Sequence, residues 1–329
     1  MLVSALLLAV MAFLSSASDV LASGQPSSAR TLSGDELVRI GEIHDVQNHF
    51  REALTYYEQA LQSYRAHKQR KGEAIALTKI GLIFERQGRR QEAAVPLHQA
   101  LSLFSKTSDS PVHADALFAS GRISLWLGAR EEAATLFERA KQRYRRSHDA
   151  RALGSVKLQS GLLKVSDGSS EEGLREIEQV LEDARTRRDQ EQVLAALVTL
   201  GDAYWILDRP REAGAQYELS LTRLEQTPQT GIEAGLRLRL AALSGATGRE
   251  EQGIESAKRA ATLYQSLRDV PGEAAALSLL ASLQQALEHE PEAEEALRRA
   301  LRIYRQQSMT VHAMRSGSPS EATAPRGSQ

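Results

Sequence analysis

Residues 77–104, LTKIGLIFERQGRRQEAAVPLHQALSLF, decide the fold of this chain. Before and after the polar turn at residues 87–90, apolar side chains recur at the i, i+3 and i+4 spacing of a helix that buries one face. They never alternate with polar residues, as they would in a half-buried strand. The stretch therefore predicts two antiparallel helices joined by a few residues.

The same hairpin pattern recurs along the chain with a step of 40 residues. A glycine inside a helix costs about 0.5–1 kcal/mol relative to alanine, so glycines kept in register indicate that another side chain packs closely there. The repeat predicts seven units over residues 37–307. Its glycines are Gly41, Gly81, Gly121, Gly161 and Gly201; its small residues include Ala53, Ala93, Ala133, Ala213 and Ala293; and its large ones include Tyr64, Phe104, Tyr144, Tyr264 and Tyr304.

Aspartates mark the expected starts of the units: Asp109, Asp149, Asp189 and Asp269. A carboxylate at the start of a helix accepts hydrogen bonds from free backbone amides and suits the positive end of the helix dipole. We expect these four residues to cap the first helix of their units.

These residues resemble the tetratricopeptide repeat family. A Leu/Ile-Gly pair and an Ala-x-x-x-Tyr/Phe/Leu pattern recur in the units, as in Ile80-Gly81 followed by Ala93 and Leu97, and Leu200-Gly201 followed by Ala213 and Tyr217. The 40-residue unit is longer than the usual 34 and is similar to the subgroup in kinesin light chains, Pins-type scaffolds and CHAT-domain proteins. The resemblance implies an all-α fold, a right-handed α-solenoid of about seven helical hairpins.

The two ends of the chain differ from the repeats. Residues 1–22 carry a short apolar run followed by small residues, which predicts a secretory signal peptide cleaved before Ser18 or Ser23. Because no Lys or Arg precedes Arg30, an uncleaved anchor or an apolar helix is the alternative. We expect a linker over residues 23–36 and a disordered tail over residues 308–329, which are rich in Ser, Gly, Pro and Ala. The predicted location is secreted or periplasmic.

Composition excludes several classes of function. With no cysteine, the chain has no disulfide, thiolate zinc site or cysteine nucleophile. Its 41 Lys and Arg balance 42 Asp and Glu, which gives no electrostatic case for nucleic acid. The eight histidines form no i, i+4 pair, and no phosphate-binding glycine loop occurs. We therefore expect no metal, no cofactor, no catalysis, no nucleic acid and no stable membrane insertion once the signal is removed.

Basic clusters occur near the ends of several second helices, for example at Lys141, Arg143, Arg145 and Arg146. An anionic ligand is one interpretation of them. Cations also complement the negative end of a helix dipole, and nearby acidic residues offset them. We interpret these clusters as helix-end cations.

The resemblance places a concave groove on the first helices of the units. By analogy with the family, positions −3, +1, +4 and +5 from each repeat glycine face it, and in units three to five they are unusually apolar. The alternative is that neighbouring units bury part of this stripe. The expected groove residues are Phe118, Arg122, Leu125, Trp126, Leu158, Leu162, Val165, Val198, Asp202 and Trp205.

The sequence thus predicts a non-catalytic scaffold that binds a partner protein, as an amphipathic helix or an extended apolar peptide. The Lys/Asn pattern by which chaperone-binding members of the family hold an acidic C-terminus is absent. The alternative function is the sensor half of a larger bacterial signalling protein that carries a CHAT-like protease or a kinase domain.

Overall fold

The computed structural model describes residues 32–104, 110–225 and 229–316, with the side chains of 306–316 left aside. These residues form fourteen helices and no strand, which confirms the all-α fold class. The expected signal peptide lies outside the described residues, as does most of the expected linker and the end of the tail.

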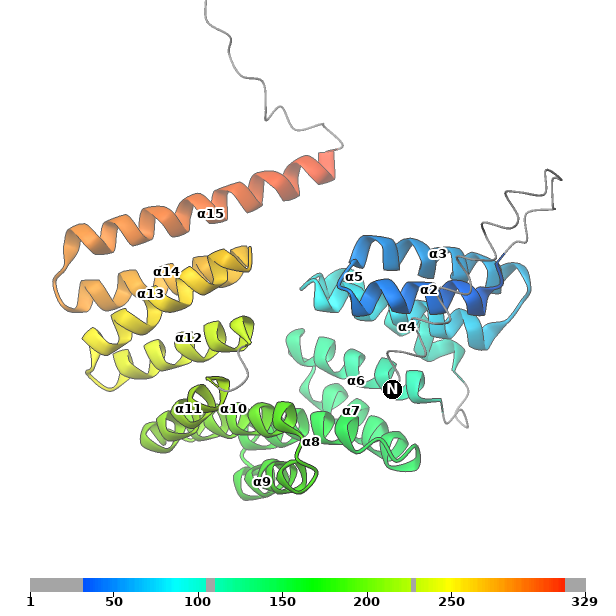
Figure 1. Cartoon of the computed structure of the whole chain (residues 1–329), viewed down its shortest axis with the longest axis horizontal. Coiled ribbons are helices and arrows are strands. Elements are labelled where there is room, and N and C mark those ends of the chain that lie inside the picture. The colour runs from blue at the N-terminus through cyan, green and yellow to red at the C-terminus, as the bar shows by residue number, and fades with distance from the viewer. Residues whose placement is uncertain (1–31, 105–109, 226–228, 317–329) are drawn as a thin grey trace, which may run out of the picture. The chain divides into compact units, whose positions relative to one another are not determined.

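The helices belong to two compact units, residues 1–129 and 130–329, which we treat separately (Figure 1). Within each unit, successive helices pack against one another as hairpins. Unit 1 holds α2 (Gly34–Val46), α3 (Phe50–Ala66), α4 (Arg70–Arg86), α5 (Arg90–Leu103) and α6 (Pro111–Trp126). Unit 2 holds α7 (Arg130–Arg146), α8 (Ala150–Ser166), α9 (Ser170–Thr186), α10 (Gln190–Ile206), α11 (Pro210–Leu224), α12 (Thr230–Ala246), α13 (Glu250–Ser266), α14 (Val270–Ala286) and α15 (Glu290–Ser316).

The repeat glycines lie where the two helices of a hairpin touch. A Cβ on Gly81 would come within 2.6 Å of the Leu97 Cγ, and one on Gly161 within 2.8 Å of an Ile177 side-chain carbon. In both hairpins the large side chain follows the glycine by sixteen residues. The repeat is therefore a packing register, because a glycine on one helix admits a large side chain from the next.

Three of the expected aspartate caps are present. The carboxylates of Asp149, Asp189 and Asp269 accept hydrogen bonds from backbone N–H groups three residues later, at 2.9, 3.1 and 3.0 Å. Asp109 lies outside the described residues. These caps satisfy amides that would otherwise have no partner at the starts of α8, α10 and α14.

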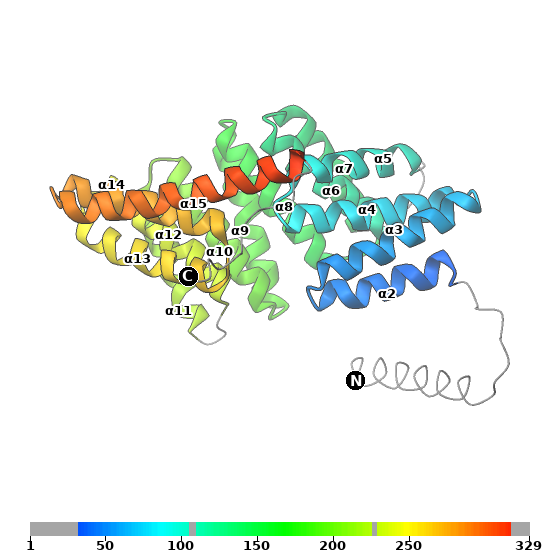
Figure 2. The same ribbon diagram turned by 90° about the horizontal axis from the view of Figure 1, so that it is seen from above.

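The last helix is longer than the repeat predicts. α15 runs to Ser316, past residue 307, where the array was expected to end. The sequence from 306 to 316 has no glycine or proline, and both appear directly afterwards at Gly317 and Pro319. Figure 2 shows α15 as the last helix of the stack in unit 2.

Candidate functional site

The ten expected groove residues belong to both units. Those on α6 lie in unit 1, and those on α8 and α10 lie in unit 2. Each unit therefore presents a candidate surface of its own.

In unit 1 the surface centres on Trp126, the last residue of α6, whose side chain is 46% exposed. The guanidinium of Arg90 lies over its ring, 6.0 Å from the centroid. Leu127, the next residue, is also exposed, and Leu125 is half-buried. An exposed indole with a cation on its face is suited to anchoring a partner.

Arg122 is engaged within unit 1. Its guanidinium donates a hydrogen bond to Glu85 of α4 at 2.6 Å and lies over the ring of Phe118, 4.6 Å from the centroid. Burial raises the pKa of Glu85, although the cation of Arg122 opposes the shift. These contacts join the first helices of two successive hairpins.

The same kind of ion pair joins other first helices. Lys79 contacts Glu42 at 2.7 Å in unit 1, and Arg239 contacts Asp202 at 2.6 Å in unit 2. In each case, as for Arg122, the partners are 37 residues apart. That spacing is one 40-residue repeat less about one helical turn. Arg122 and Asp202, two of the expected groove residues, thus belong to a series of contacts between successive repeats.

In unit 2, Asp202 of α10 is the centre of a polar cluster. Arg239 donates two hydrogen bonds to its carboxylate, at 2.6 and 3.0 Å, and the Tyr217 hydroxyl donates a third at 2.7 Å. Burial, and then the Asp202 carboxylate, raise the pKa of Tyr217 well above its usual range. Tyr217 therefore remains a donor at any physiological pH.

The other expected residues of unit 2 differ in exposure. Leu158 and Val165 are buried in a core cluster, and Leu162 and Val198 are partly buried against such clusters. Trp205 is 40% exposed, and the adjacent Ile206 is 46% exposed. The accessible apolar surface of α10 therefore lies at its C-terminal end.

An apolar face on α15 was not foreseen from the sequence. Leu297, Leu301 and Tyr304 follow one another at helical spacing and are each nearly half exposed. In an earlier repeat the counterpart of Tyr304 is Tyr64, which packs against Gly72 of the next hairpin. The repeat register could have indicated this face, because no described helix follows α15 to cover it.

A buried ion-pair cluster in unit 2 was also missed. Lys141 of α7, interpreted from the sequence as a helix-end cation, is only 2% exposed and forms an ion pair with another helix. Its ammonium contacts Glu176 of α9 at 2.8 Å and Ser160 of α8 at 3.0 Å. Lys164 of α8 also reaches Glu176, at 3.0 Å, and pairs with Glu172 at 2.6 Å. We call this cluster, in which α7 and α9 meet over α8, the charged seam; its residues are Lys141, Ser160, Lys164, Glu172 and Glu176.

Electrostatics in the charged seam favour the ionised state of Glu176. Burial alone would raise its pKa, but hydrogen bonds from Lys141 and Lys164 outweigh that effect and hold the pKa below the usual glutamate value. The carboxylate therefore stays charged and paired at neutral pH. One signal in the sequence could have located the seam, because Lys141 occupies a position that holds Leu in most other repeats.

Within the described residues, no group of three or more His, Cys, Asp or Glu side chains is arranged to hold a metal ion. None of the helices in that part of the chain has the length and apolar character needed to cross a bilayer.

Comparison with known proteins agrees with the repeat architecture. A family model described as tetratricopeptide repeat matches residues 38–102 and 78–148. Tetratricopeptide repeats are thus supported in this third of the chain. No curated protein matches the chain. The specific long-repeat subgroup remains a prediction.

Solved structures resemble the chain over most of its length. A Rap protein complexed with Competence and Sporulation Factor is 17% identical, with a TM-score of 0.65 over 89% of this chain and 80% of that one. The Rap conjugation gene regulator of plasmid pLS20, in complex with the Phr* peptide, is 16% identical, with a TM-score of 0.61 over 88% and 82%. A signal transduction ATPase of Pyrococcus horikoshii with a tetratricopeptide repeat sensor is 17% identical, with a TM-score of 0.59 over 82% and 41%. At these identities the likeness shows a common helical-repeat fold.

Proposed function

We propose that this chain is a non-catalytic scaffold that binds a partner protein or peptide through the exposed tryptophans at the ends of α6 and α10. The observation that carries the proposal is the exposure of Trp126 and Trp205, each beside a further exposed apolar residue. Tryptophan is enriched among interface hot spots because it buries a large area with few rotamers. Two of the similar folds were solved in complex with Competence and Sporulation Factor and with the Phr* peptide, and the second supports a peptide as the ligand class.

The chemistry of the two surfaces favours an amphipathic helix or an extended apolar peptide. Leu127 and Ile206 extend the apolar area beside the indoles, and Arg90 supplies a cation next to Trp126. Ion pairs already engage Arg122 and Asp202, so we assign them the role of holding the first helices in place.

Selection from a displayed library of random peptides tests the proposal. Peptides selected on the parent chain should lose about 2 kcal/mol of binding free energy, roughly thirtyfold in affinity, when the tryptophan that they contact is changed by Trp126→Ala or Trp205→Ala. Val46→Ala is the matched control, because Val46 is an exposed apolar residue at the end of another first helix. Selected peptides that bind both tryptophan variants as tightly as the parent would refute the assignment.

Export is a further part of the proposal. It rests on the apolar run and the small residues within residues 1–22. N-terminal sequencing of material from the native envelope should find a start at Ser18 or Ser23, whereas an intact Met1 on a cytosolic product would contradict export.

The second candidate function is that of a sensor within a larger signalling protein. It is favoured by the likeness to the signal transduction ATPase, of which this chain spans 41%. Reading the native genomic locus distinguishes the two functions. An effector domain encoded in the same reading frame would support the sensor, and its absence would favour the free-standing scaffold.

A further inference from the structure

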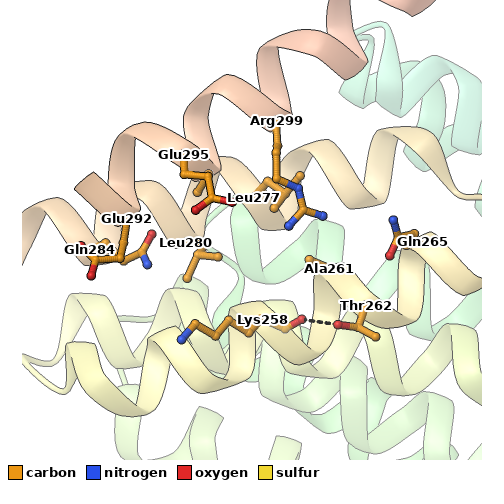
Figure 3. Close-up of a pocket in the computed structure, with 11 residues that line it drawn as sticks. Lys258, Ala261, Thr262, Gln265, Leu277, Leu280, Gln284, Glu292, Glu295 and Arg299 are labelled. Atoms are coloured by element: carbon orange, nitrogen blue, oxygen red, sulfur yellow. Dashed lines mark hydrogen bonds between the residues drawn. The ribbon is translucent and has the colours of Figure 1, made fainter. Parts of the chain in front are cut away.

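A cavity of about 460 Å³ opens in unit 2 where α13 and α15 meet over α14 (Figure 3). Leu277 and Leu280 of α14 line it between Ala261 of α13 and Ala296 of α15. Its volume is within the range of small-ligand sites in proteins. Two of its walls are second helices of their hairpins, and none of the residues that line it belongs to α6 or α10. We call the place the open seam.

The open seam is the counterpart of the charged seam, exactly three repeats further along the chain. A step of 120 residues takes Lys141 to Ala261 and Glu176 to Ala296. The same step takes Lys164 to Gln284. Lys141, Glu176 and Lys164 are thus replaced by smaller side chains, whereas Ser160 is replaced by Leu280, and all four replacing residues line the cavity.

One polar group in the open seam has an unmet requirement. Gln284 lines the cavity and is only 5% exposed, yet its Oε1 atom has no hydrogen-bond partner among the described residues. A buried amide oxygen of this kind is expected to accept a hydrogen bond from a ligand or an ordered water. An N–H or O–H donor that enters the cavity can satisfy it once the amide of Gln284 turns toward the cavity.

Charged side chains of both signs line the cavity. Glu292 and Glu295 line it, as do Lys258 and Arg299. Glu273, which is not part of the lining, pairs with Arg299 at 3.7 Å, which leaves two lining carboxylates beside Lys258. Glu292 stands at the position of Glu172, which pairs with the ammonium of Lys164 in the charged seam, and Figure 3 shows Gln284 and Glu292 at the same end of the cavity.

We propose that the open seam binds an aliphatic primary ammonium group. The alkyl stem lies on Leu277 and Leu280, and the ammonium donates to Oε1 of Gln284 beside the carboxylate of Glu292. Beside Glu292 the ammonium of the ligand takes the place that the Lys164 ammonium has beside Glu172 in the charged seam. Its source is either a small free amine or a lysine side chain of a partner protein, and the proposal holds independently of the tryptophan surfaces.

Leucine-methyl NMR of the whole chain tests the proposal with pentylammonium as the first probe. Saturable shifts should appear at the methyls of Leu277 and Leu280, and pentanoate, which has the opposite charge, should cause none. Gln284→Leu, which removes the acceptor, and Ala261→Leu, which fills the cavity, should each weaken binding by about tenfold or more. Ala275→Leu is the matched control, because Ala275 is exposed on the same α14.

A second probe distinguishes the sources. Nα-acetyl-lysine methylamide carries the ammonium on a peptide-like backbone, and its norleucine analogue lacks the charge. Binding of the lysine compound, with little binding of the analogue, assigns a partner's side chain, and binding of pentylammonium alone assigns a free amine. Leu181 and Leu221 occupy the position of Ala261 in other repeats, so the filled variant should fold, and Gln284→Leu tests the site without added volume. The proposal is overturned if neither probe binds, if pentanoate binds equally well, or if both variants keep the parent affinity.

Discussion

The charged seam and the open seam occupy equivalent places in unit 2, yet they are filled in opposite ways. In the first, Lys141 and Glu176 meet at 2.8 Å, with Ser160 beside them. In the second, two alanines stand at the positions of that lysine and glutamate, Leu280 replaces the serine, and a cavity remains. The helices in the two places begin 120 residues apart in each case, so we attribute the difference to the side chains.

This contrast separates two kinds of position within a repeat. The position of Gly161 holds a small residue in both seams. In the charged seam Ile177 packs against Gly161, and in the open seam Ala281 stands at the position of the glycine. The side chains that occupy the seam, by contrast, vary between repeats. The position of Lys141 holds Leu at 181 and 221 and Ala at 261, and the helices keep the same 40-residue register. A repeat protein can therefore acquire a ligand site at a seam without altering its fold.

The largest expected effect comes from breaking the charged seam. Glu176→Ala removes the buried one of the two carboxylates that pair with the Lys141 ammonium and leaves the half-exposed Glu138, so it should lower the free energy of unfolding by about 3 kcal/mol. Glu172→Ala is the control, because Glu172 is 63% exposed and its loss should cost much less than the loss of Glu176. Chemical denaturation of both variants measures the difference.

The pH dependence of that loss checks its cause. The folded-state pKa of Glu176 lies below its unfolded value of 4.5, so its contribution is fully present above pH 4.5 and is lost as the pH falls through the folded pKa. The stability difference between the parent and Glu176→Ala should therefore shrink in acid. A difference that stays constant from neutral pH into acid would show that lost packing, rather than charge, causes the effect.

The next effect concerns the position that both seams keep small. Gly161→Leu should lower the free energy of unfolding by about 1–3 kcal/mol, because its side chain would meet Ile177 and the carbonyl oxygen of Gly173. Thermal melts beside those of Ala275→Leu, an exposed position, separate overpacking from a general effect of leucine. Equal melting temperatures would show that α8 and α9 do not need the glycine.

Filling the open seam should act in the opposite direction. Ala261→Leu places the side chain found at Leu181 into the cavity and should raise the free energy of unfolding by about 1 kcal/mol. Urea denaturation in the absence of any amine measures this change. A destabilised variant would mean that the walls of the cavity cannot accept the added volume.

The smallest effect is expected in the turns that follow the two seams. Gly168, between α8 and α9, has a φ of +91°, and its counterpart Glu288, between α14 and α15, has a φ of +60°. Because left-handed backbone favours glycine, Gly168→Ala should cost about 1 kcal/mol, and Glu288→Gly should gain somewhat less. Differential scanning calorimetry should show a lower melting temperature for Gly168→Ala and a higher one for Glu288→Gly. A shift of both melting temperatures in the same direction would contradict this account of the turns.

Much of the fold was predictable from the sequence because its determinants are local and repeated. The 40-residue glycine register predicted the helical hairpins, and three aspartate caps are present where they were expected. The extension of α15 to Ser316 was not predicted, because the sequence analysis expected helices only where apolar residues recur at helical spacing. Residues 306–316 lack that spacing but contain no glycine or proline, and they continue the helix.

The candidate site was less predictable because it depends on contacts between repeats. The sequence singled out Trp126 and Trp205, and their exposure is compatible with partner binding. It did not indicate that Arg122 and Asp202 pair within the chain, because their partners are 37 residues away on another helix. Nor did a basic cluster reveal the burial of Lys141, since burial depends on what α8 and α9 place around it.

A double-mutant cycle at Ala261 and Ala296 most directly tests the claim that these two residues face each other across the open seam, as Lys141 and Glu176 do across the charged seam. A261K and A296E alone should each destabilise the chain, because each places a charge in the seam without its designed partner. Together they should restore stability, with a coupling free energy of about 1 kcal/mol or more in the unfolding equilibrium. Strictly additive losses would contradict the account, because they would show that the two positions do not face each other as Lys141 and Glu176 do.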